Sequence, residues 1–118
     1  MYAGVVGEVE GSDAGPLLER EQIDAARTRQ TSGNDKCLYF ESTFGLGFFT
    51  SSPFAPYGVE GNFGHAGAGG SVGFADPENQ IGFGYVMNKM NQNLSADPRT
   101  SGLIRATYEA VGVEPTLV

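Results

Sequence analysis

Large apolar residues alternate with glycine in two stretches of the chain, Phe44–Phe48 and Ile81–Met87. In a β-strand, this alternation places the bulky side chains on one face and leaves the other face nearly flat. A helix can pack closely against such a flat face. The pattern therefore predicts two strands that each offer one flat side.

The segment Ser71–Ala75 also alternates with the period of a strand. Residues 76–79 separate it from Ile81–Met87, and Pro77 is preset for the second position of a tight turn. The two segments are therefore predicted to form an antiparallel hairpin. Residues 36–41 are predicted as a further short strand, whereas residues 31–35 and the proline-containing residues 50–57 are predicted as loops.

Two helices are expected. Good helix formers with apolar positions on one face occupy Leu17–Arg27. Near the other end of the chain, Asp97 before Pro98 is an N-cap followed by a first-turn proline, and Gly112 is a natural stop. The predicted apolar face of this second helix consists of Leu103, Ile104, Thr107, Tyr108 and Val111. This helix is the best candidate to cover the flat side of the sheet, so the expected fold class is α+β, an antiparallel sheet with a C-terminal helix packed on one face.

The first sixteen residues stand apart from this pattern. Glycines among alternating valines and glutamates fit an edge strand or a frayed end, and the sequence leaves both open. We therefore divide the chain into a flexible or edge segment, residues 1–16, and a domain over residues 17–118. One domain is the most that 118 residues support, and with 18 glycines and no tryptophan its large contact area must come mainly from eight Phe and five Tyr.

Charge and composition exclude several classes of partner. The net charge of −7 argues against nucleic acid, because a phosphate backbone would be repelled. No apolar run is long enough for a membrane span and the start lacks the form of a signal peptide, so we expect a soluble chain, cytoplasmic by default. The single Cys37 is interpreted as a small, partly buried hydrophobe. With one histidine in the chain, we expect no metal site and no cofactor.

The only histidine lies in the most glycine-rich stretch, Phe63–Pro77. A histidine followed by a glycine-rich turn and an alternating segment is typical of a strand edge, where bare backbone N–H groups can approach a ligand. A phosphate-binding loop is excluded because no lysine precedes Ser71. A dinucleotide fingerprint is excluded because a strand, not a helix, is predicted after the glycines.

The stretches Phe63–Pro77 and Ile81–Met90 resemble the C-terminal end of the β-lactamase-related serine hydrolases, which include class C β-lactamases, D-alanyl-D-alanine peptidases and family VIII esterases. The resemblance is continuous from about Leu17 to the last helix, and its most specific part runs from His65 to Met90. It implies a partial β-lactamase/transpeptidase-like fold, of which residues 17–118 are the incomplete C-terminal portion.

In that family, three motifs meet around the acyl group: a Ser-x-x-Lys that carries the nucleophile, a Tyr-x-Asn or Tyr-x-Ser, and a Lys/His-x-Gly on an inner strand. His65-Ala66-Gly67 matches the third motif. The resemblance implies that His65 faces the substrate, with Gly67 beside it, and that the backbone N–H of Ala68 is one arm of an oxyanion hole. For His65, the alternative of a strand-end histidine bonded to a loop stays open.

The other two motifs are absent. Gly33 and Val86 stand three residues before the two lysines, Lys36 and Lys89, so there is no Ser-x-x-Lys. None of the five tyrosines is followed two residues later by Asn or Ser. We therefore assign no catalytic residue in this chain and predict that it is inert alone.

Two functions remain open. The first is the C-terminal part of a serine hydrolase that acts on an ester, amide or β-lactam through an acyl-enzyme, with that small-molecule substrate and the missing N-terminal part of the same domain as its partners. In that case an inner strand of the parent sheet is exposed, and the isolated chain is marginally stable. The second is a non-catalytic remnant or interaction module without hydrolase activity.

Overall fold

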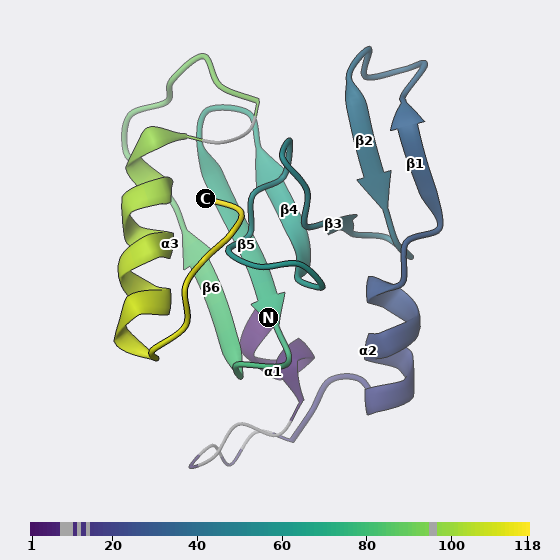
Figure 1. The fold of residues 1–118 in the computed structure, drawn as a ribbon, viewed down its shortest axis with the longest axis vertical. Helices are drawn as coiled ribbons and strands as arrows, with labels where there is room; N and C mark the ends of the chain where they lie inside the picture. The colour runs from purple at the N-terminus through teal and green to yellow at the C-terminus, as the bar shows by residue number, and fades with distance from the viewer. Residues whose placement is uncertain (8–10, 12, 14, 95–96) are drawn as a thin grey trace.

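A six-stranded antiparallel sheet forms the centre of the computed structural model, which describes residues 1–7, 11, 13, 15–94 and 97–118. Strands that follow one another in the chain are also neighbours in the sheet (Figure 1). The strands are β1 (Thr31–Asn34), β2 (Glu41–Phe44), β3 (Phe49–Thr50), β4 (Phe63–Gly67), β5 (Ser71–Asp76) and β6 (Ile81–Tyr85). Every connection joins two adjacent antiparallel strands, so each strand pairs only with the strands that come directly before and after it in the chain.

The hairpin of β5 and β6 confirms the prediction made from the alternating pattern. Phe74 pairs with Phe83 across the two strands, and Asp76 pairs with Ile81 next to the turn. Asp76 shapes the turn, because its Oδ1 accepts the backbone N–H groups of Glu78 at 3.1 Å and Asn79 at 3.0 Å. These are the local side-chain bonds by which aspartate favours turns.

The C-terminal helix α3 (Pro98–Ala110) is capped as predicted, but it lies on the other face of the sheet. Its Ile104 and Tyr108 are buried in one cluster with Phe74, on the bulky face rather than the glycine face. Leu103 and Val111, predicted on the packed side of the helix, are 48% and 51% exposed. The bulky face offers far more apolar area for burial than the flat one, which explains why the helix packs there.

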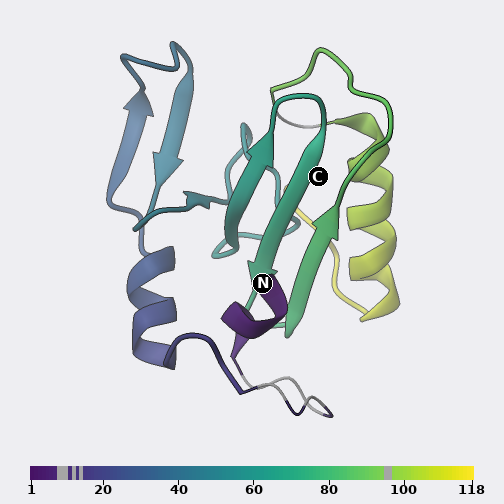
Figure 2. The ribbon, with the colours of Figure 1, turned by 180° about the vertical axis from the view of Figure 1, so that it is seen from behind.

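The glycine face is covered instead by a short helix, α1 (Tyr2–Val6), on the opposite side of the sheet from α3 (Figure 2). A Cβ added at Gly73 would overlap the ring of Tyr2, and one added at Gly82 would lie 2.5 Å from the backbone nitrogen of Ala3. An edge strand or frayed end is therefore wrong for Tyr2–Val6, where close packing on a flat surface overrides the strand-like composition. Residues 8–10, 12 and 14 of this first segment lie outside the described residues.

The helix α2 (Arg20–Arg27) confirms the other predicted helix with a later start. A capping box between Glu19 and Gln22 begins the helix there instead of at Leu17. Ile23 and Ala26 are its buried residues, and Ile23 joins a second core cluster that also contains Phe63 of β4. The helix therefore adds to the core on the α1 side of the sheet.

Between α2 and β4, four sequence predictions are wrong. The predicted loop at residues 31–35 contains β1, and the predicted strand at residues 36–41 mostly forms the turn of the β1–β2 hairpin, where Cys37 is exposed rather than partly buried. The stretch Phe44–Phe48 is not a strand either, because β2 ends at Phe44 and the chain turns through Gly47, with φ 81°, into β3. Glycine here serves the turn and not a flat strand face.

No helix in the described part of the chain is long and apolar enough to cross a membrane. Within the same residues, no group of three or more His, Cys, Asp or Glu side chains is placed to hold a metal ion.

Candidate functional site

The histidine motif lies on β4, where one side of that strand loses its partner. On the side away from β5, the neighbouring strand β3 pairs only with Phe63 and Gly64, and no strand of the described chain continues beside His65 on that side. The N–H of Ser51 donates to the carbonyl of Asn62 at 2.8 Å, so alternation along β4 directs the main-chain groups of Ala66 to this same open side. The motif therefore ends at an open strand edge, as the glycine-rich pattern predicts.

His65 is exposed, and one of its two ring nitrogens is already hydrogen-bonded to the backbone. Its Nδ1 lies 2.7 Å from the carbonyl oxygen of Ala66, and because a carbonyl can only accept, Nδ1 carries the hydrogen. The ring also lies 4.8 Å from the ring of Phe49, between centroids. This fixes the orientation of the imidazole and leaves Nε2 as the nitrogen that can meet a ligand.

The turn after β4, which carries Ala68, is fixed by surrounding polar groups. The N–H of Gly69 donates to the carbonyl of Asn93 at 3.0 Å, and Arg99 Nη2 donates to the carbonyl of Gly69 at 3.2 Å. Arg99 is in turn held by Asp97, whose Oδ1 accepts its Nε at 2.9 Å. This hydrogen bond from Arg99 holds the pKa of the Asp97 carboxyl well below its usual range. The backbone at Ala68 is therefore held in place before any ligand arrives.

The open edge of β4 faces an apolar cavity of about 460 Å³. His65, Ala66 and Ala68 form one side of it. Its apolar lining includes Leu38, Phe40, Phe44, Phe49, Phe54 and Leu94. The structure thus brings His65 and Ala68 to one cavity, whereas Gly67 does not line it; a Cβ at Gly67 would overlap only the Ser71 hydroxyl, which can rotate away.

The aromatic wall of this cavity, formed by Phe40, Phe44, Phe49 and Phe54, was not predicted from the sequence. The rings of Phe40 and Phe54 stack with centroids 4.0 Å apart, and those of Phe44 and Phe49 do the same at 4.0 Å. Six of the eight phenylalanines lie between residues 40 and 63, and that clustering was the available signal. It was not decisive, because the rings come from separate turns and strands that only the fold brings together.

Tyr57 adds a buried polar group to the cavity lining. Its hydroxyl makes no hydrogen bond of good geometry within the described residues. Burial raises the pKa of this phenol. A buried hydroxyl without a full partner is unusual in a folded chain and can accept or donate to a bound molecule.

The described residues around the cavity can bind and polarise a ligand, but they do not include the serine nucleophile of the family motif. No Ser, Thr or Lys is found among its described lining residues, and Cys37 and Tyr57 have no neighbouring base there other than His65. The cavity therefore has a candidate hydrogen-bonding group, His65, and an open strand edge, without a serine nucleophile.

A family model described as β-lactamase matches residues 7–106. The chain belongs to the β-lactamase family. The match spans the open strand edge, the hairpin and most of α3, so the resemblance predicted from the His65–Met90 region is confirmed.

Two kinds of relative support this assignment to the β-lactamase family. The esterase/β-lactamase LipL of Mycobacterium tuberculosis is 34% identical over 94 residues, which cover 76% of this chain and 20% of that protein. A penicillin-binding protein homologue from Caulobacter crescentus superimposes with a TM-score of 0.80 at 37% identity, covering 92% of this chain and 29% of the other.

Two esterases have the same fold. EstA from Arthrobacter nitroguajacolicus matches with a TM-score of 0.79 and 34% identity, covering 94% of this chain and 30% of its own. A family VIII carboxylesterase matches with a TM-score of 0.78 and 29% identity, covering 92% of this chain and 29% of its own. The predicted fold, a partial β-lactamase-like antiparallel sheet with a C-terminal helix on one face, is confirmed. The chain spans about a fifth of the curated relative and less than a third of these solved structures.

Proposed function

We propose that this chain is the C-terminal part of a serine hydrolase and forms one wall of its acyl-binding site, while the nucleophile comes from the missing N-terminal part of the same domain. The observation that carries the proposal is the exposed His65 beside an open strand edge and a cavity whose described lining contains no Ser, Thr or Lys. A site with binding groups and no serine nucleophile fits one part of a divided active site.

Each residue has a role in the proposed reaction. The serine oxygen attacks the carbonyl carbon, and the negative charge that develops on the carbonyl oxygen is stabilised by the N–H of Ala68. Because the turn at Ala68 is already held by Asn93 and Arg99, little reorganisation is needed. His65 Nε2, whose partner nitrogen Nδ1 already donates to Ala66, accepts a hydrogen bond from the substrate. The tetrahedral adduct then breaks its bond to the leaving alcohol, which takes up the proton given up by the serine, and water later releases the acid from the acyl-enzyme.

The lining favours an ester with an apolar substituent over a charged substrate. Apolar residues, four of them phenylalanines, provide most of the wall, and His65 is the only residue of the described lining that can become a cation. A β-lactam antibiotic carries a carboxylate that needs a positive partner, whereas an uncharged ester needs only apolar contact. We therefore place carboxylic esters first, and amides and β-lactams after them.

A chimera tests the proposal. Residues 1–118 would replace the matching C-terminal segment of the family VIII carboxylesterase, and hydrolysis of a chromogenic aryl ester and a chromogenic cephalosporin would be measured. We expect ester turnover, and a loss of about 10- to 100-fold in kcat/KM for His65→Ala because one positioned hydrogen-bonding group is removed. Arg105→Ala, an exposed change on α3, is the matched control and should leave kcat/KM unchanged.

The second candidate function is a non-catalytic remnant or interaction module, and it is supported by the absence of both Ser-x-x-Lys and Tyr-x-Asn from this sequence. A folded chimera that turns over neither substrate would support it and contradict the hydrolase proposal. Reading the transcript upstream of Met1 is an independent test, since the hydrolase proposal expects both missing motifs there.

A further inference from the structure

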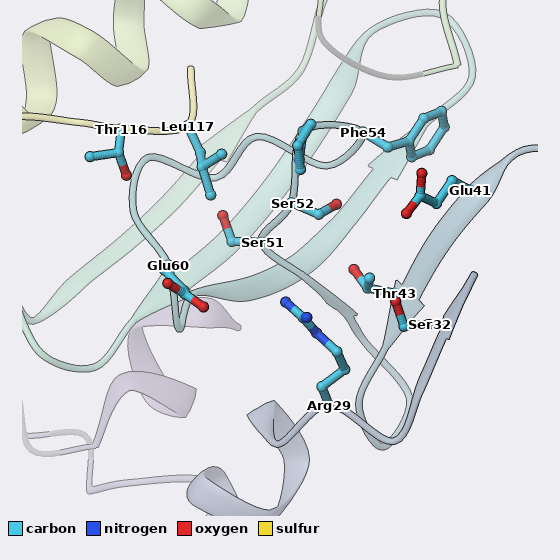
Figure 3. A pocket seen from close by; sticks show the side chains of 11 residues that line it. Arg29, Ser32, Glu41, Thr43, Ser51, Ser52, Phe54, Glu60, Thr116 and Leu117 are labelled. Atoms are coloured by element: carbon cyan, nitrogen blue, oxygen red, sulfur yellow. The ribbon is translucent and has the colours of Figure 1, made fainter. Parts of the chain in front are cut away.

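A second cavity, of about 380 Å³, opens beside the first. It lies between the β1–β2 hairpin, the segment that follows β3, and Thr116–Leu117 near the end of the chain (Figure 3). Phe54 lines both cavities, so the two are neighbours that share one ring as a wall. Unlike the first cavity, this one is rich in charged and hydroxyl groups, and the proposed hydrolase chemistry does not use it.

Three possible donors, Arg29, Ser51 and Ser52, line this second cavity. Arg29 extends into it, and its guanidinium makes no ion pair with any described residue (Figure 3). Ser51 Oγ accepts the N–H of Tyr57 at 3.3 Å, and Ser52 Oγ accepts the N–H of Ala55 at 3.2 Å. Because these oxygens already accept, their own hydrogens remain available to donate, and Ser51 is only 3% exposed. A carboxylate oxygen on a ligand suits all three groups.

Two carboxylates in the lining outnumber the single cation, Arg29. Glu41 and Glu60 line the same cavity, and neither forms an ion pair within the described chain. With Arg29, they give the lining an excess of one negative charge, which disfavours a dianion such as phosphate and favours a ligand that also carries an ammonium group. Phe54 and Leu117 supply apolar contact for the rest of such a molecule.

We propose that this second cavity binds a small zwitterion of the α-amino-acid type with an apolar side chain. Its carboxylate meets Arg29, Ser51 and Ser52, its ammonium meets Glu60 or Glu41, and its side chain lies against Phe54 and Leu117. The site is independent of the proposed hydrolase function, because it shares neither His65 nor Ala68 with the first cavity.

Three matched probes test this proposal on the 118-residue chain by titration of its amide NMR signals. L-leucine carries both charges, N-acetyl-L-leucine lacks the ammonium group, and L-leucinamide lacks the carboxylate. We expect L-leucine to give saturable shifts at Ser51, Ser52 and Glu60, and each of the other two probes to bind at least about tenfold more weakly, since each loses a charge-assisted contact.

Variants assign the charged contacts. Arg29→Gln should weaken L-leucine binding about tenfold or more, whereas Arg105→Gln, which changes an exposed arginine outside the cavity, should not. Glu60→Gln is compared with Glu109→Gln on α3 in the same way, and if Glu60→Gln is silent, Glu41→Gln must carry the loss. The proposal is overturned if L-leucine gives no saturable shift up to about 20 mM, if L-leucinamide binds as well as L-leucine, or if the shifts centre on His65 and Ala68.

Discussion

Tyr57 and Tyr108 are both almost fully excluded from solvent, but within the described residues only the hydroxyl of Tyr108 is hydrogen-bonded. Tyr108 on α3 donates its hydroxyl to Asp76 Oδ2 at 2.6 Å, and this contact joins the helix to the end of β5. Tyr57 has a buried hydroxyl without a properly formed bond in the described chain. The first hydroxyl therefore stabilises the fold, whereas the second is costly to bury and available for a ligand.

Replacing each tyrosine by phenylalanine separates the two cases. Tyr108→Phe should lower the free energy of unfolding by about 1.5 to 3 kcal/mol, because a buried carboxylate loses a donor. Tyr57→Phe removes no formed bond and should change it by less than about 1 kcal/mol, in either direction. Urea denaturation measures both, and each variant serves as the control for the other. Equal losses would contradict the assignment of a bonded and an unbonded hydroxyl.

The buried carboxyl of Asp76 makes stability depend on pH. Burial alone raises the pKa of Asp76, but hydrogen bonds from Tyr108, Asn79 and Asn62 outweigh it and hold that pKa below its usual value. A carboxyl with a depressed folded-state pKa stabilises the protein above its unfolded-state pKa of about 4, and this contribution is lost as pH falls through the folded-state value.

We therefore expect the urea midpoint of the wild-type chain to fall as pH is lowered from about 5 to 2. Asp76→Asn should be less stable at neutral pH and should lose less stability over that range, because its side chain cannot take up the proton. Glu114→Gln, which alters an exposed carboxylate without a hydrogen bond or ion pair among the described residues, should follow the wild-type curve. A curve for Asp76→Asn parallel to that of the wild type would contradict the role of Asp76.

At the scale of elements, the glycine face of β6 contains a matched pair of positions. A Cβ at Gly82 would lie 2.5 Å from the backbone of α1, whereas nothing lies within 4 Å of one at Gly84, two residues along on the same face. Gly82→Ala should cost about 1 to 3 kcal/mol, since backbone must move. Gly84→Ala should be neutral or stabilise by up to about 1 kcal/mol, because glycine in a strand is entropically costly. Thermal denaturation of both variants, with amide exchange in α1, makes the measurement.

Sequence reasoning succeeded for elements whose signals are local. The hairpin around Pro77 and the cap at Asp97 are set by neighbouring residues, and both formed as predicted. The alternation in β6 showed that one face was bulky and the other flat, but not which helix would lie on each. That choice depends on α1, a segment with no helical periodicity long enough to detect.

In the candidate site too, the residues close together in the sequence were predicted, whereas those brought together only by the fold were not. His65 and Ala68 are three residues apart and were expected to meet one ligand, and the structure brings both to one cavity. The phenylalanine wall and the orphan hydroxyl of Tyr57 depend on turns far from β4 in sequence, so no local pattern predicted them. Their roles toward a substrate stay predictions until the chimera is measured.

At the scale of the whole molecule, the sheet ends at β6 without a further partner in the described chain. The main-chain alternation that directs Ala66 outward on β4 also directs Gly82 and Gly84 away from β5, toward this open edge. The loop after β6 exposes apolar side chains, with Val86 84%, Met90 71% and Leu94 64% exposed. An unpaired edge next to exposed apolar residues is typical of a surface that another segment covers.

We expect the N-terminal part of the domain that our proposal requires to add a strand at this edge, and Gly84 offers a sharp test. Gly84→Pro removes an outward N–H without breaking a bond to β5, so the chain itself should stay folded. Binding of a tagged N-terminal part of the Caulobacter crescentus homologue, measured by calorimetry, should weaken about tenfold or more, because one bond is lost and the ring obstructs pairing. Gly84→Ala retains the N–H and should bind like the wild type. Undiminished binding by Gly84→Pro would exclude strand addition at β6 and leave the exposed Val86, Met90 and Leu94 as the contact surface instead.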